Sequence, residues 1–147
     1  MTGVIDRSFI GKTYPPFAAE VSASFCLDYN RLLNVKGLPE FSPDRPPLNW
    51  PALMTLHGTA CLLPLWEDLG VDPLETRLFR ERFVHQRPVE CGEPLTGVLT
   101  IDDVTEQVEP NSHIEDHIEL RVDFADSAGA PVATYHCSFR ISLAGPG

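Results

Sequence analysis

The stretch Trp50–Leu69, WPALMTLHGTACLLPLWEDL, is the most apolar part of the sequence and decides the fold. Its apolar residues recur at helical spacing and widen into a stripe that nearly surrounds a helix: Leu53, Met54, Leu56, Ala60, Cys61, Leu62, Leu63 and Leu65. A helix that is apolar on almost every side belongs in the middle of a fold. We therefore expect one long central helix over Trp50–Leu69, kinked near Pro64 and ended by Gly70.

In the second half of the chain, apolar and polar residues alternate with a period of two. Ile114–Phe124 alternates apolar with mostly charged residues, Asp126–Gly129 has the composition of a turn, and Ala133–Leu143 alternates again. This pattern on both sides of a turn predicts a long antiparallel hairpin with one buried face. Two further strands are predicted over Thr76–His85 and Pro94–Glu106.

The first half supplies a short strand, a helix and a loop. Ser22–Leu33 is predicted to be a helix capped by Ser22, and residues 34–51 hold five prolines, which is typical of a long loop. The element order predicts an α+β hot-dog arrangement, a curved antiparallel sheet wrapped around a long central helix, in a single domain over residues 1–147. Because one helix leaves an edge or face of such a sheet uncovered, we expect a dimer.

Composition limits the partners and the compartment. The chain has 147 residues, a net charge of −10 and only the lysines Lys12 and Lys36, which argues against nucleic acid as a partner. Its apolar run is too interrupted to span a membrane and Met1–Arg7 is no signal peptide, so we expect a cytoplasmic protein. The four cysteines are too dispersed for a metal knuckle or redox pair, and we expect them to be reduced; no metal site is predicted.

Two segments carry a family resemblance. Phe9–Pro16, FIGKTYPP, precedes a helix bearing Tyr29, and Phe83–Leu95, FVHQRPVECGEPL, is similar to a strand-turn-strand pattern F…PV..GD.L. In this order they resemble the MaoC-like hydratase and dehydratase hot-dog proteins, over about residues 9–143. The likeness is strongest to the MaoC N-terminal-half type, which includes mycobacterial hydroxyacyl-thioester dehydratase subunits. It implies an acyl-CoA or acyl-carrier-protein thioester as ligand, (R)-specific hydration of an enoyl thioester or the reverse dehydration, and no cofactor.

The chain departs from this family at the catalytic dyad. Hydration of an enoyl thioester needs a base, an acid and N–H donors at the carbonyl, and catalytic members carry the first two as Asp and His in a GDxNPxH motif. The corresponding window, Asn34–Phe41, reads NVKGLPEF and has neither residue. The leading hypothesis is a subunit that binds the acyl chain and works with a dyad-bearing partner, as a homodimer or heterodimer.

Other residues are candidates for chemistry in place of the dyad. His57, followed by Gly58, lies where the family binds the thioester carbonyl and is a candidate acid or base; the alternative is a core histidine. Glu40 and Asp44 are loop carboxylates of the kind that hot-dog thioesterases use to activate water; the alternative is a solvated loop. The alternative functions are therefore a thioesterase, or a non-enzymatic acyl-thioester-binding protein.

Three residues are candidates for substrate binding without chemistry. Asn49 and Trp50 precede or begin the central helix and are predicted to line the mouth of an acyl site, or to anchor the helix by packing. Arg87 belongs to a local group of arginines with Arg77, Arg80 and Arg82 that suits a phosphate of CoA or phosphopantetheine. The alternative for this group is a charged strand edge that discourages aggregation.

Overall fold

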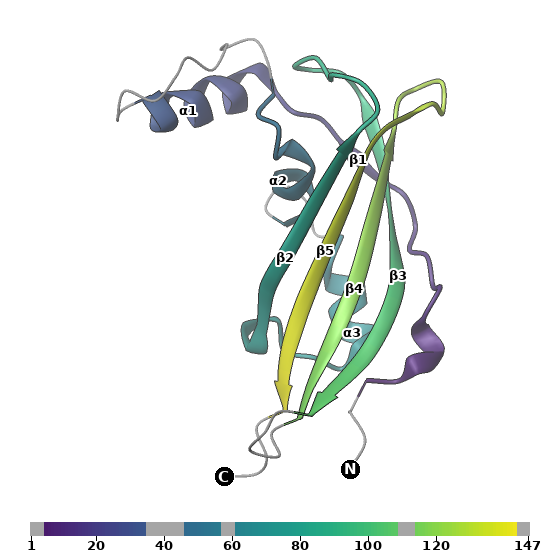
Figure 1. The fold of residues 1–147 in the computed structure, drawn as a ribbon. Coiled ribbons are helices and arrows are strands. Elements are labelled where there is room, and N and C mark those ends of the chain that lie inside the picture. The colour runs from purple at the N-terminus through teal and green to yellow at the C-terminus, as the bar shows by residue number, and fades with distance from the viewer. Residues whose placement is uncertain (1–4, 35–45, 57–60, 109–113, 144–147) are drawn as a thin grey trace.

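Five antiparallel strands form one curved sheet, with two short helices against one side of it (Figure 1). The computed structural model describes residues 5–34, 46–56, 61–108 and 114–143. The strand order is β1-β3-β4-β5-β2. The elements are η1 (Arg7–Phe9), β1 (Phe17–Ala19), α1 (Ala23–Asn34), α2 (Trp50–Leu56), α3 (Leu63–Leu69), η2 (Pro73–Glu75), β2 (Thr76–His85), β3 (Leu95–Val108), β4 (Ile114–Ala125) and β5 (Pro131–Leu143).

The predicted C-terminal hairpin is confirmed as β4 and β5. Its turn is closed by the Asp126 carboxylate, which accepts hydrogen bonds from the backbone N–H groups of Ala128 at 3.0 Å and Ala130 at 2.9 Å. The apolar residues of the two strands face each other in register and are buried: Ile118 with Phe139, Leu120 with Cys137, Val122 with Tyr135 and Phe124 with Ala133. The residues that recur with a period of two therefore form the buried face of these two strands, which packs in the core.

The strands predicted over Thr76–His85 and Pro94–Glu106 are also confirmed, as β2 and β3. Strand β3 pairs with β4 along most of its length and with β1 at its start, where Phe17 lies opposite Gly97. Strand β2 is at the other edge of the sheet, and within the described residues its ladder partner is β5.

The helix α1 begins as expected. The Ser22 hydroxyl accepts a hydrogen bond from the N–H of Phe25 at 3.1 Å, which caps the first turn. In Figure 1 this helix extends away from the upper end of the sheet, whereas α2 and α3 lie against the sheet. Neither α1 nor any other helix among the described residues combines the length and hydropathy needed to cross a bilayer.

The predicted long helix over Trp50–Leu69 is correct in position and wrong in continuity. Its two ends are separate helices, α2 and α3, and Cys61 and Leu62 form a turn before α3. Pro64 explains the break, because proline has no N–H for the preceding helical turn but fits the first turn of a new helix. Gly70 ends α3 in the left-handed conformation, at φ 64°, as expected.

Helices α2 and α3 each pack against the sheet through one tryptophan. The Trp50 ring at the start of α2 meets the Phe124 ring edge-on, with centroids 4.8 Å apart, and the Trp66 ring of α3 meets Phe139 in the same way at 5.2 Å. The two tryptophans are 2% and 6% exposed. Helix α2 and the buried side of α3 thus form the inner layer of the core, with β4 and β5 over it. The expectation of burial on almost every side is wrong for α3, because its other side, from Leu63 and Pro64 to Glu67 and Asp68, is exposed.

Candidate functional site

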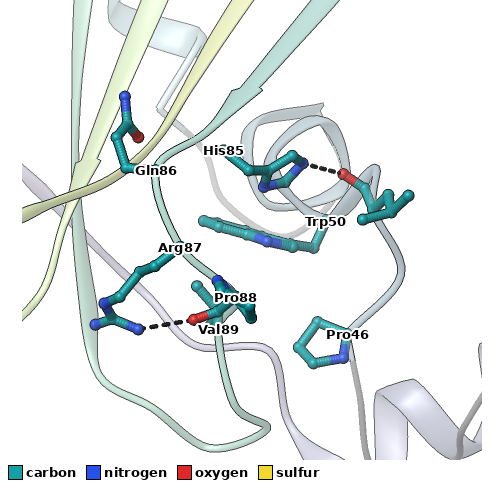
Figure 2. Close-up of a pocket in the computed structure, with 8 residues that line it drawn as sticks. Pro46, Trp50, His85, Gln86, Arg87, Pro88 and Val89 are labelled. Carbon is teal, nitrogen blue, oxygen red and sulfur yellow. Dashed lines mark hydrogen bonds between the residues drawn. The ribbon is translucent and has the colours of Figure 1, made fainter.

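A cavity of about 360 Å³ lies where the N-terminus of α2 meets the end of β2 (Figure 2). This volume lies within the range of ligand-binding pockets, about 300–1,000 Å³. Among the described residues, its lining consists of Pro46, Leu48, Trp50, His85, Gln86, Arg87, Pro88 and Val89. Pro46, Leu48, Trp50, Pro88 and Val89 make most of this lining apolar. The polar side chains belong to one segment, His85–Arg87.

Trp50 is the large buried surface of this cavity. Pro47, also buried, precedes it, and the N–H of Trp50 donates to the Pro47 carbonyl at 2.9 Å, which starts the first turn of α2. The ring is held between Phe124 of β4 and the His85 ring, whose centroid lies 6.3 Å away. The side chain is therefore both the packing anchor of α2 and a wall of the cavity, so the two interpretations of Trp50 are compatible.

His85 joins the loop before α2 to the end of β2. Its Nε2 lies 2.8 Å from the backbone carbonyl oxygen of Leu48. The dashed line from the His85 ring in Figure 2 marks this hydrogen bond. A carbonyl can only accept, so Nε2 carries the proton of this hydrogen bond, and in the neutral ring Nδ1 is left as an acceptor. The imidazole thereby holds the rim of the cavity in place and offers one polar atom beside an apolar surface.

Arg87 is engaged by two carboxylates from different turns. Its Nη1 donates to Glu93 at 3.1 Å and its Nη2 donates to Asp126 at 3.2 Å. The guanidinium holds the pKa of Glu93 below its usual value. The pKa of Asp126 is also lowered, first by the hydrogen bond from the Ala130 N–H and second by the hydrogen bond from Arg87. The positive charge is therefore matched within the chain, and its predicted contact with a ligand phosphate stays a prediction.

This cluster predicts a dependence of stability on pH. Because the pKa values of Glu93 and Asp126 are lowered in the fold from 4.5 and 3.8, the unfolded chain binds more protons in acid, and stability falls as pH drops below about 4.5. Arg87→Gln should lower stability at pH 7 and make the loss between pH 5 and 3 shallower, measured by urea denaturation at each pH. Arg77→Gln on the exposed edge is the control, and equal slopes in all three proteins would contradict the assignment.

The remaining predicted site residues are placed as follows. The Asn49 side chain donates from Nδ2 to the Tyr29 hydroxyl at 3.1 Å, so it ties α1 to the start of α2 and is not among the cavity-lining residues. Its role in binding stays a prediction. Glu40, Asp44, His57 and Gly58 lie outside the described residues, and so does most of the window where the family has its dyad.

Of the predicted site residues that lie in the described part of the chain, Trp50 and Arg87 are brought to one cavity. The residues that the sequence did not single out for this site are Pro46, Leu48, His85, Gln86, Pro88 and Val89. A signal for four of them was present, because 85–89 lies inside the family-like segment Phe83–Leu95. Among the residues that the structure describes, no three His, Cys, Asp or Glu side chains gather as a metal site.

A curved antiparallel sheet that covers central helices is the hot-dog fold, so the predicted fold class is confirmed. No family model matches the chain. A UPF0336 protein of Saccharopolyspora erythraea is 27% identical in an alignment 149 positions long, which covers 88% of this chain and 86% of that protein.

Solved structures with the same fold include MaoC-like proteins. The HadBC (3R-hydroxyacyl-ACP dehydratase) complex of Mycobacterium tuberculosis matches with a TM-score of 0.67 and 18% identity, over 90% of this chain and 96% of that one. A MaoC-like dehydratase matches with a TM-score of 0.69 and 18% identity, over 91% of this chain and 42% of that one. The resemblance to MaoC-like hot-dog proteins is thus confirmed at the level of the fold.

Two further solved structures share the fold at lower TM-scores. The ChsH1-ChsH2 complex of Mycobacterium tuberculosis matches with a TM-score of 0.61 and 13% identity, over 91% of this chain and 86% of that one. A 1,4-dihydroxy-2-naphthoyl-CoA thioesterase from Synechocystis matches with a TM-score of 0.52 and 12% identity, over 92% of this chain and 85% of that one. The fold therefore accommodates both dehydratases and thioesterases.

Proposed function

We propose that this chain is a cytoplasmic acyl-thioester-binding subunit of the MaoC-like type, which works with a dyad-bearing partner in hydration of enoyl thioesters or dehydration of 3-hydroxyacyl thioesters. The observation that carries the proposal is the largely apolar cavity between Trp50 and residues 85–89. An acyl chain gains by leaving water for such a surface, by about 25 cal/mol per Å² of apolar area. The polar groups at His85 and Gln86 suit the thioester end of the ligand.

The catalytic partner is inferred from what the sequence lacks. Residues 34–41 have neither the Asp nor the His that carry proton transfer in catalytic members of the family. Two of the similar structures, HadBC and ChsH1-ChsH2, are complexes of two different subunits. A second hot-dog chain supplying the dyad would complete the acid–base machinery that this chain lacks.

The edge strand β2 is the surface that we propose for this partner. Most of its side chains are exposed, including the apolar Leu78 and Val84 at 39% and 40%. A long edge strand with exposed apolar residues tends to pair with another strand. A partner strand added beside β2 would bury these residues and extend the sheet across the dimer.

The proposal is tested by three measurements on the purified chain. Binding of a saturated acyl-CoA is measured by calorimetry, hydration of a trans-2-enoyl-CoA by loss of the enoyl absorbance, and hydrolysis by release of free CoA thiol. We expect binding without turnover by the chain alone, and turnover when a dyad-bearing MaoC-like subunit is added. Hydration by the chain alone would contradict the need for a partner, and absence of binding would contradict the whole proposal.

His85 provides a test of where the ligand binds. His85→Ala removes the hydrogen bond to Leu48 and the polar atom at the cavity, and should weaken acyl-CoA binding about five- to tenfold, the equivalent of one lost hydrogen bond. His136→Ala is the matched control, since His136 contacts Arg82 and Asp102 and is not among the cavity-lining residues. Equal affinity of the two variants would place the ligand elsewhere.

A thioesterase is the second candidate, favoured by the fold shared with the naphthoyl-CoA thioesterase. In that case Glu40 or Asp44 would activate water, and the purified chain would release CoA without a partner. Glu40→Gln and Asp44→Asn distinguish the two carboxylates, because only the catalytic one should abolish thiol release. Binding with neither reaction, with or without a partner, would instead support a non-enzymatic acyl-thioester-binding protein.

A further inference from the structure

Two cysteines that are distant in sequence meet in the fold. The Sγ atoms of Cys26 and Cys91 are 2.9 Å apart, although 65 residues separate them in the chain. Cys26 belongs to α1, and Cys91 to the turn between β2 and β3. Spacing along the chain gave no sign of this contact, because it does not report contacts between distant elements.

The backbone holds the two thiols together independently of their own contact. The N–H of Gly92, next to Cys91, donates to the Val21 carbonyl at 2.9 Å, and the N–H of Cys26 donates to the Ser22 carbonyl at 3.0 Å. Gly92 adopts φ 81°, which sets the direction of the turn. Bond formation therefore requires the sulfur atoms to approach by less than about 1 Å, since an S–S bond is about 2.05 Å long.

We propose that Cys26 and Cys91 form a redox-active thiol pair that closes to an intramolecular disulfide when a peroxide oxidises the protein. Cys91 is partly exposed and Cys26 is fully buried, so the Cys91 sulfur reacts first. It takes one oxygen atom from the peroxide, which leaves as water, and becomes a sulfenic acid. The Cys26 sulfur then attacks Cys91, hydroxide leaves and takes up the Cys26 proton, and a second water is formed.

The order of these steps follows from the environments of the two thiols. Burial, together with the neighbouring Cys91, raises the pKa of the Cys26 thiol, so Cys26 is a poor initial nucleophile. Contact between the sulfur atoms supplies the high effective concentration that the second step needs. A thiol reductant reverses the reaction by exchange.

The disulfide would link two segments that border the candidate site. Cys91 lies two residues after Val89, which lines the cavity, and α1 carries Tyr29, which accepts the hydrogen bond of Asn49 before α2. Oxidation would therefore join α1 covalently to the end of the cavity-lining segment. This inference concerns the thiols alone and does not depend on the proposed function.

The test is oxidation of the purified chain by a small excess of hydrogen peroxide, followed by alkylation and intact mass measurement without reductant. We expect a loss of two hydrogen atoms per chain, a non-reduced peptide containing Cys26 and Cys91, and reversal by dithiothreitol. The closed loop should raise the melting temperature by about 5–10 °C. Cys91→Ser should abolish all four effects, whereas Cys61→Ser is the matched control and should retain them.

The contrary outcomes are equally specific. Addition of two or three oxygen atoms at Cys91 in place of a disulfide, a link involving another cysteine, or a link between two chains would overturn the proposal. If Cys91→Ser fails to fold, the peptide map of the unsubstituted protein decides, because it identifies the linked cysteines directly.

Discussion

Replacing Trp50 by alanine should lower the free energy of unfolding by about 3–5 kcal/mol, the range for removal of a large buried aromatic side chain. The indole is 2% exposed, packs edge-on against Phe124 at 4.8 Å and begins α2. Its loss would leave an empty space beside β4 and release the start of the helix. Urea denaturation followed by circular dichroism measures the change.

Two variants separate packing from a general effect of substitution in this region. Leu48→Ala changes a cavity-lining side chain that is 79% exposed and should alter stability by less than about 0.5 kcal/mol. Trp50→Phe keeps an aromatic ring and should recover most of the stability. A loss below about 1 kcal/mol for Trp50→Ala would show that the ring is not the anchor of α2.

Gly97→Ala should lower the free energy of unfolding by about 1–3 kcal/mol, although alanine is usually the better residue in a strand. Gly97 of β3 lies opposite Phe17 of β1, and a Cβ at this position would lie 2.7 and 2.9 Å from Cε1 and Cε2 of the Phe17 ring. The ring would have to leave its edge-on contact with Phe124 at 5.9 Å. The overlap therefore outweighs the gain of up to about 1 kcal/mol in backbone entropy.

A double-mutant cycle with Phe17→Ala tests this reason directly. In the Phe17→Ala background the added methyl group no longer meets a ring, so Gly97→Ala should be neutral or stabilising there. The diagnostic result is that the effect of Gly97→Ala on the free energy of unfolding changes sign between the two backgrounds, as measured by the same urea denaturation. An equal loss in both backgrounds would mean that the backbone at Gly97, and not the space occupied by Phe17, excludes the methyl group.

The strands were predictable because their determinants are local. In β4 and β5 most apolar residues alternate with polar ones, Asp116 being an exception on the buried side of β4, and the Asp126 turn joins the strands, so the pattern identifies the buried face. Strand β2 was predicted with the ends that the structure has, Thr76 and His85. Its place at the edge of the sheet, beside β5, could not be read from its own residues.

The central helix shows where local reasoning loses accuracy. The apolar stripe over Trp50–Leu69 indicated a segment buried on almost every side, and this holds for α2. Helix α3 buries one side, with Leu65, Trp66 and Leu69, and exposes the other, where Leu63 is 55% exposed. The stripe could not distinguish one kinked helix from two, because Pro64 is compatible with a kink and with the first turn of a new helix. Packing of Trp50 on Phe124 and of Trp66 on Phe139 holds the two parts at different places on the sheet.

By itself, the sequence determined the period of each element, the identity of the buried faces and the absence of the Asp-His dyad from residues 34–41. These features depend on residues within a few positions of one another. Only the tertiary structure decided that His85 meets Leu48, that Arg87 is matched by Glu93 and Asp126, and that Cys26 touches Cys91. These contacts join helices, strands and turns that are distant in the sequence, so the spacing of residues along the chain does not specify them.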